Sequence, residues 1–181
     1  MKFHVFGVII IIIAVIASCA KPPEQEMAAA KAAVDSAKSV EADRYAPDLF
    51  NQAKTKLNAG LSEVTNKNYE EAAKMLVDAK NTAKQAADAV PGKKEEMKAQ
   101  TESLLEQIPA AVDNARKAWR KAPRGKGTRE TLQMIKDEIS AQEAAVDQVK
   151  QTLESGDMLT AKQQAQAIID KLASITQELQ P

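Results

Sequence analysis

The sequence predicts an all-α protein: an antiparallel helical bundle with coiled-coil-like seams, built from about six helices in two three-helix units. Apolar residues recur every three or four positions from about residue 24 onward, which is the spacing of one helix face. No segment alternates apolar and polar residues with the period of two that marks a strand. The apolar positions carry mainly Ala with scattered Leu, Ile, Val and Met, so we expect helices packed closely along narrow seams.

The first unit is expected to span residues 24–90 and to contain three helices. Apolar spacing predicts helices at about 24–44, from Pro47 to about residue 65, and from 69 to 90. Proline suits the first turn of a helix, and Asn68 is a candidate N-cap for the third helix. Pro91-Gly92 predicts the end of that helix and of the unit.

The second unit, residues 92–181, is expected to contain three further helices. The fourth helix runs to about residue 121, and Pro109 is expected to kink it. Thr128 is a candidate cap for the fifth helix, and Gly156 suits the left-handed position after its end. Asp157 is the expected cap of the sixth helix.

The N-terminus has the pattern of a secretory leader that ends at the chain's single cysteine, Cys19. The apolar run Val5–Ala17 is too short to span a bilayer, for which roughly 20 residues are needed, and fits the h-region of a signal peptide. It leads into Ile16-Ala17-Ser18-Cys19, which resembles the lipobox of bacterial lipoproteins. Two alternatives stay open: a retained short membrane anchor, and ordinary cleavage after Ala20.

The lipoprotein resemblance implies a signal peptide at 1–18 and a lipidated cysteine with a short tether at 19–23. Such proteins carry a diacylglyceryl group on the cysteine and commonly a further fatty acid such as palmitate on its amine. Two or more chains hold a protein on a membrane essentially permanently. In the sorting rule of such lipoproteins, Asp after the cysteine retains the protein at the inner membrane. Ala20 follows here, which favours the outer membrane, facing the periplasm.

Composition argues against catalysis, so we expect no enzyme and no cofactor. The only histidine, His4, lies in the leader, which would leave the mature chain without the usual base for a Ser or Cys nucleophile. The missing His and Cys also disfavour a zinc site, and we expect no metal. The chain holds 25 basic and 25 acidic residues, so no overall field favours nucleic acid.

One basic segment, residues 116–129, is the candidate binding site. It contains seven cations and no acid around the chain's only tryptophan, Trp119. These residues could bind anionic lipid or glycan, such as lipopolysaccharide or peptidoglycan. The alternative is a solvated turn with Trp119 plugging the bundle. The candidate residues are Arg116, Lys117, Trp119, Arg120, Lys121, Arg124, Lys126 and Arg129.

Residues 27–90 resemble a family: the Ala-rich helical domain of unknown function found in envelope lipoproteins of Gram-negative bacteria. The resemblance is carried by Ala32-Ala33-Val34, Arg44-Tyr45-Ala46-Pro47-Asp48-Leu49 and Asn68-Tyr69-Glu70-Glu71-Ala72. That domain often precedes an OmpA-like peptidoglycan-binding module, whereas residues 92–181 are predicted to be helical here. The resemblance implies a location and a shape, and no activity.

Together these features predict a lipid-anchored periplasmic structural or adaptor lipoprotein of the bacterial envelope. The expected partners are the membrane, through the lipid on Cys19, and an envelope protein. The alternative is a binding module for an anionic envelope glycan or lipid, acting through residues 116–129.

Overall fold

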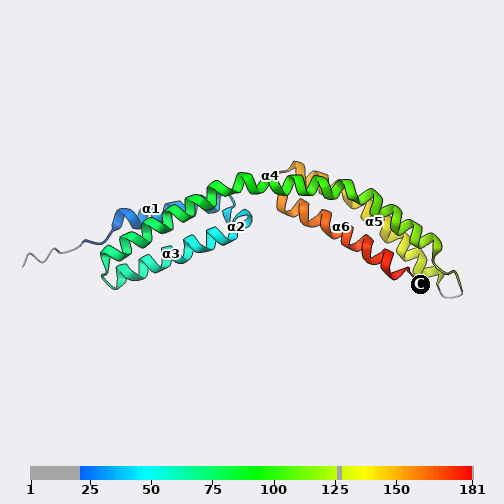
Figure 1. Ribbon diagram of the computed structural model, residues 1–181, viewed down its shortest axis with the longest axis horizontal. Coiled ribbons are helices and arrows are strands. Elements are labelled where there is room, and N and C mark those ends of the chain that lie inside the picture. The colour runs from blue at the N-terminus through cyan, green and yellow to red at the C-terminus, as the bar shows by residue number, and fades with distance from the viewer. Residues whose placement is uncertain (1–20, 126–127, 181) are drawn as a thin grey trace, which may run out of the picture.

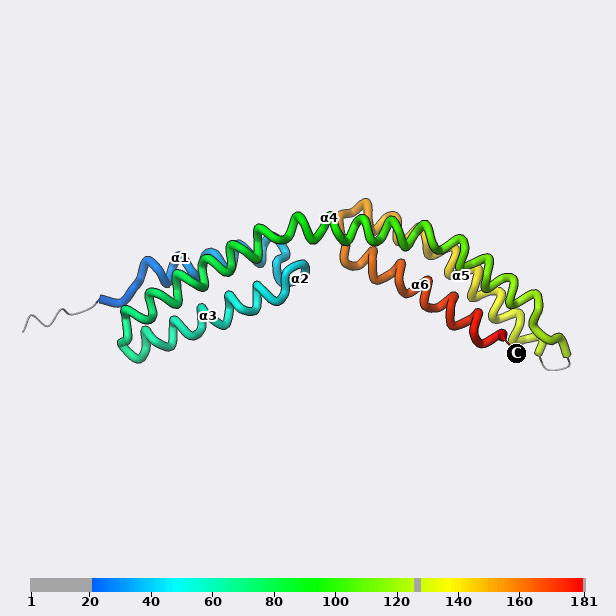
Figure 2. Tube along the Cα trace, viewed as in Figure 1, coloured from blue at the N-terminus to red at the C-terminus, as the bar shows by residue number. Residues whose placement is uncertain are grey.

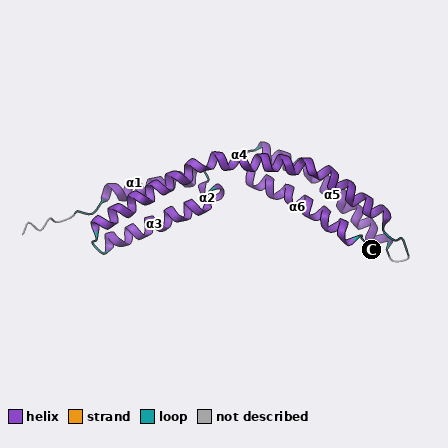
Figure 3. Cartoon of the chain, in the orientation of Figure 1, coloured by secondary structure: helices purple, strands orange, loops and turns teal. Residues whose placement is uncertain are grey.

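A computed structural model of the protein describes residues 21–125 and 128–180. Within these ranges the chain is all-α and has no strand, as the sequence predicts (Figure 3). The described residues form six helices: α1 (Glu24–Ser39), α2 (Ala42–Tyr45), α3 (Pro47–Thr65), α4 (Tyr69–Lys121), α5 (Arg129–Glu154) and α6 (Met158–Glu178). None of these helices is long and apolar enough to cross a membrane.

The molecule is an arched rod whose length is set by α4 (Figure 1). This single helix has 53 residues, which at 1.5 Å per residue corresponds to about 80 Å. Helices α1, α2 and α3 pack on its first half, and α5 and α6 pack on its second half. The first described residues and the α4–α5 connection therefore lie at opposite ends of the rod (Figure 2).

The prediction that Pro91-Gly92 ends a helix is wrong, because α4 continues through both residues and also through Pro109. Proline removes one helical hydrogen bond and crowds the preceding turn, at a cost of about 3 kcal/mol in a helix interior. Pro91 and Pro109 are both exposed, so their rings do not disturb the packed faces. Packing of the flanking residues holds the helix together, and α4 bows rather than breaks (Figure 2).

The first predicted helix, 24–44, is also shorter than expected. Helix α1 ends at Ser39, and Glu41 has a left-handed backbone with φ of 66°. One further helical turn, α2, follows before Pro47 begins α3. The Glu41 carboxylate accepts hydrogen bonds from Lys94 and Arg44, and these partners hold the unusual turn that no glycine signals.

The predicted helix ends are right at three positions and wrong in detail at two. Pro47 occupies the first turn of α3, Gly156 has φ of 90°, and Asp157 accepts a hydrogen bond from the Thr160 N–H. Asn68 and Thr128 precede helices, but their side chains do not cap them. Asn68 donates to Glu63 instead, and the Thr128 hydroxyl bonds to the backbone of Gly125.

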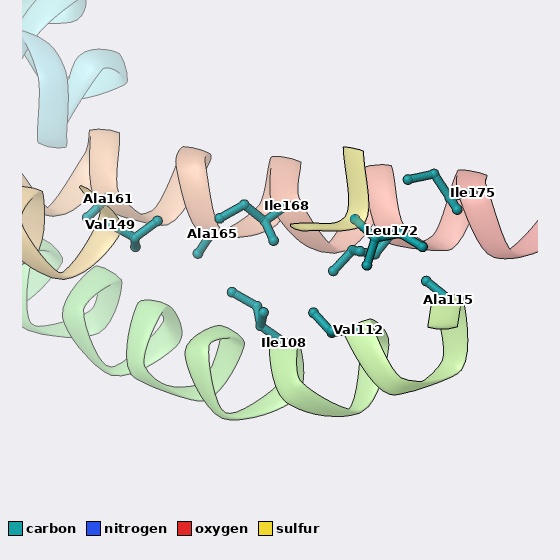
Figure 4. Packing of buried hydrophobic residues seen from close by; sticks show 10 residues of the cluster. Ile108, Val112, Ala115, Val149, Ala161, Ala165, Ile168, Leu172 and Ile175 are labelled. Carbon is teal, nitrogen blue, oxygen red and sulfur yellow. The ribbon is translucent and has the colours of Figure 1, made fainter. Parts of the chain in front are cut away.

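The core is a thin seam that follows the rod. In the second half, Ile108, Val112 and Ala115 of α4 face α6, while Val149 comes from α5 (Figure 4). In the first half, the apolar residues that recur at helical spacing in the predicted helix 69–90 are buried: Ala72, Leu76, Ala79, Ala83, Ala86 and Val90. Buried Val112 and Thr101 were not predicted, and the Thr101 hydroxyl is satisfied by the carbonyl of Met97.

A polar joint connects the two halves, and we define it as Arg44 and Tyr45 of α2 with Asp157 and Leu159 at the start of α6. The Arg44 guanidinium lies 2.7 Å from the Asp157 carboxylate. Tyr45 is buried, and its hydroxyl accepts a hydrogen bond of 3.5 Å from the Leu159 N–H. Leu159 also packs against the core of the first half. The two hydrogen bonds of the joint each connect residues more than 110 positions apart in the sequence.

The carboxylates around the joint are held in their charged forms. Burial raises the pKa of Asp157, but hydrogen bonds from Thr160 and Arg44 outweigh it, so the pKa lies below its ordinary value. The hydrogen bond from Lys94, followed by that from Arg44, lowers the pKa of Glu41. The carboxylates of Asp157 and Glu41 are therefore ionised at neutral pH.

Candidate functional site

The residues that follow Cys19 in sequence and the basic segment lie at opposite ends of the rod. Cys19 lies outside the described residues, but Lys21–Pro23 lie beside Tyr69 and Glu70 in the first turn of α4. The basic segment lies at the other end of α4. About 80 Å of helix therefore separates the tether from the candidate binding site.

The structure places the basic segment at the tip of the rod, across the end of α4 and the connection to α5. Arg116, Lys117, Arg120 and Lys121 occupy the last turns of α4, where cations interact favourably with the helix dipole. Arg124 lies in the connection and Arg129 begins α5. Lys126 lies outside the described residues.

Trp119 is fixed in place at this tip. Its indole N–H donates a hydrogen bond of 2.7 Å to the carbonyl of Leu132 on α5. Its ring packs against the core of the second half while remaining partly exposed. Two cations lie near the ring centre, the Arg124 guanidinium at 4.9 Å and the Lys136 ammonium at 6.0 Å. The tryptophan thus packs against the core and orders the cations around it.

Two shallow clefts flank Trp119. The first, between the connection and α5, has a volume of about 480 Å³ and includes Arg124, Arg129, Gln133 and Lys136 in its lining. The second, between α4 and α5, has a volume of about 350 Å³ and includes Arg116, Arg120, Lys136 and Ser140. Both clefts contain Trp119 and Lys136.

The cations of the segment are not equally free. Arg116 pairs with Glu143, and Lys117 pairs with Asp113. The Lys117 hydrogen bond lowers the pKa of Asp113, so this acid remains charged beside the site.

Arg120 is only loosely paired, at 4.0 Å from Asp113. Within the described part of the chain, Lys121, Arg124, Arg129 and Lys136 form no salt bridge. Cations without a salt bridge are therefore concentrated around the side of Trp119 that faces the connection between α4 and α5.

Sequence reasoning missed Lys136, because this residue lies seven positions beyond Arg129 and outside the dense basic run. The predicted antiparallel topology of the fourth and fifth helices could have indicated it. Two antiparallel helices joined at about residue 125 place residue 136 opposite residues near 115. The same pairing brings Leu132 to Trp119.

Comparison with known proteins yields one match. Residues 25–102 match the model of a family described as a domain of unknown function (DUF4398). The matched segment contains α1, α2 and α3 and ends inside α4, beyond the predicted boundary at residue 90. No curated protein and no solved structure shows a significant match to the chain.

The arrangement at the tip is suited to binding anions. Arginine and lysine side chains of two helices and one connection converge on a fixed aromatic ring, and neutral hydrogen-bonding groups accompany them in each cleft. Arginine forms planar, paired hydrogen bonds with carboxylates and phosphates. The matched family domain does not include this tip.

Proposed function

We propose that the protein is a lipid-anchored structural or adaptor lipoprotein of the bacterial cell envelope, and that it has no enzymatic activity. The observation that carries this proposal is α4, a helix of 53 residues that runs through both halves of the rod. A long helix that carries packed helices on each of its halves is a spacer between two ends. Exposed polar faces on every helix longer than one turn offer surface to protein partners along the spacer.

The proposed anchor is the lipid on Cys19, and the proposed location is the outer membrane, facing the periplasm. The lipobox and Ala20 support this assignment. The position of Lys21–Pro23 at one end of the rod is in keeping with it, because a lipid attached there would leave the remaining length free to project from the membrane.

We also propose that residues 24–90 and 92–181 form two three-helix units that share α4. Core residues group accordingly: one cluster joins α4, α5 and α6, and others join α1, α2 and α3 with the first half of α4. The joint around Arg44 and Asp157 would set the angle between the units.

A second candidate function is binding of an anionic envelope glycan or lipid by the basic tip. The cleft between the connection and α5 favours it, since Arg124, Arg129 and Lys136 in its lining have no salt-bridge partner among the described residues. A partner protein on the helix faces and a ligand at the tip are compatible in one adaptor.

The test of the adaptor function is crosslinking in living cells from the exposed helix faces, with identification of the attached protein. Cys19→Ser removes the proposed lipid site and provides the control for localisation. Recovery of peptidoglycan or lipopolysaccharide from the tip, and of no protein from the helix faces, would favour the second function instead.

A further inference from the structure

The two clefts at the tip are parts of one surface, because Trp119 and Lys136 line both. Lys136 comes from α5, and its ammonium group lies 6.0 Å from the centre of the Trp119 ring. Arg124 and Arg129 lie on one side of this pair, and Arg116 and Arg120 lie on the other. A ligand that fills both clefts must therefore cross at Lys136.

Trp119 is positioned to organise this surface rather than to enter a membrane. Its indole N–H donates to the Leu132 carbonyl at 2.7 Å, and its ring packs against the core of the second half. Membrane-interface tryptophans need a ring that can move into the headgroup layer. The nearest exposed large apolar side chain among the described residues is Met134, and it lines neither cleft. One methionine is too little apolar surface to anchor the tip in lipid.

The chemistry of the lining favours a soluble polyanion that also carries hydroxyl groups. Arg124, Arg129 and Lys136 supply positive charge without a salt bridge from any described acid. Gln133 in the first cleft and Ser140 in the second present oxygen atoms that can accept hydrogen bonds. The Gln133 amide NH2 donates to Asp137, and the Ser140 hydroxyl donates to the carbonyl of Lys136. Sugar hydroxyls can donate to such acceptors, whereas a phosphate diester has no hydrogen to donate.

We propose that Lys136 and Trp119 form the centre of a two-cleft site for a linear acidic glycan, whose successive carboxylates reach the cations on both sides of Lys136. The inference rests on the second proposed function and assigns its ligand class. Lys136 is the binding residue common to both clefts, and Trp119 is a positioning residue that holds Arg124 and Lys136 through cation–π contacts.

The test uses the intrinsic fluorescence of Trp119, which reports on the site alone because it is the chain's only tryptophan. The full chain in neutral detergent micelles is titrated with an oligogalacturonate, a glycan with one carboxylate per sugar. We expect a saturable fluorescence change that weakens with salt. Lys136→Gln should lower the affinity by about tenfold, as expected for the loss of one charge-assisted contact.

Lys121→Gln is the matched control. Lys121 is a candidate from the sequence, but it is exposed at the same tip and lines neither cleft, so the two-cleft site does not include it. It removes the same charge and should change the affinity less than about twofold, because only screened long-range attraction is lost. Lys136→Arg should retain binding, which would show that the loss in Lys136→Gln comes from charge and not from misfolding.

Three outcomes would overturn the proposal, and they differ in whether they also contradict the proposed anion-binding function. Equal losses in Lys136→Gln and Lys121→Gln would mean a diffuse basic patch, leaving the anion-binding function intact. A fluorescence change only in micelles containing phosphatidylglycerol would make the ligand a lipid. No fluorescence change with the oligogalacturonate or with phosphatidylglycerol micelles at low salt would also contradict the proposed anion-binding function. The adaptor function would still be decided by the crosslinking test.

Discussion

Gly60 of α3 lies against the fully buried side chain of Leu76 on α4. A Cβ atom at residue 60 would come within 2.9 Å of the Leu76 Cγ atom and 3.3 Å of its backbone nitrogen. Leu76 has no exposed surface, so it has no solvent into which to move. The missing side chain at residue 60 therefore allows α3 and α4 to approach closely.

We predict that Gly60→Ala destabilises the protein by about 1–3 kcal/mol, the usual cost of overpacking a core. Gly92→Ala is the matched control. Gly92 also lies inside a helix, α4, but no atom is within 4 Å of a Cβ added to it. Alanine there should stabilise the helix by about 0.5–1 kcal/mol. Urea unfolding followed by circular dichroism measures both. Stabilisation by both substitutions would show that α3 and α4 do not pack as closely as described.

Single residues also mark where sequence reasoning succeeded and where it failed. The apolar seam was readable because its spacing is regular, and Leu76, Leu172 and Ile175 on this seam are fully or almost fully buried. Lys136 was missed because its role depends on the pairing of α4 with α5 and not on its neighbours in sequence. Lys126 and Cys19 lie outside the described residues, so their roles stay predictions.

At the scale of the elements, the joint gives a structural role to the Arg44-Tyr45-Ala46-Pro47 turn. Arg44 and Tyr45 end α2 and bind the start of α6, from the other half of the molecule, while Pro47 begins α3. Asp157 has two tasks there, since it caps α6 through Thr160 and pairs with Arg44. The two tasks can be separated by substitution.

We predict that Asp157→Asn costs less than about 1 kcal/mol, because asparagine retains the cap and loses only a partly exposed ion pair. Asp157→Ala should cost about 1–2 kcal/mol, because it removes the cap as well. Urea unfolding of the two variants gives the comparison. If the two substitutions cost the same, the Thr160 cap contributes nothing and our description of the start of α6 is wrong.

The sequence predicted helix boundaries correctly only where the boundary residue itself determines the backbone conformation. The ring of Pro47 fixes its φ angle and Gly156 permits a φ of 90°, so the start of α3 and the end of α5 were predictable. Pro91-Gly92 looked like a stop, but packing on both sides of it outweighs the cost of a proline. The turn at Glu41 depends on distant Lys94, and no local pattern could indicate it.

For the whole molecule, the proposal of two units predicts that one half can unfold before the other. Leu172 is fully buried in the core of the second half, and Leu172→Ala should cost that half about 2–5 kcal/mol. Trp119 fluorescence reports only this half, whereas circular dichroism reports all helices.

In urea, the fluorescence midpoint of Leu172→Ala should therefore move to lower concentration and leave a later helical transition from the first half. The unsubstituted protein provides the reference midpoints. Coincident transitions by both probes in the variant would contradict the proposal, because they would show that α4 couples the whole rod into one cooperative unit.

The shape of the molecule was only partly predictable. Periodicity indicated helices and short turns indicated antiparallel neighbours, and both hold for α3, α4 and α5. The rod arises from the continuity of α4, which local signals argued against. The separation of the tether from the basic tip follows from that continuity, so it also required the structure.

The most direct test of the adaptor function is photo-crosslinking in living cells from two exposed stripes. One stripe on α4 is sampled at Val77, Lys84 and Asp88, and one on α3 at Asn51, Thr55 and Asn58. We predict that one envelope protein crosslinks repeatedly from one stripe and not from the other, and that Cys19→Ser abolishes both the crosslink and membrane association. The same weak and varied products from both stripes, unchanged by Cys19→Ser, would contradict the account.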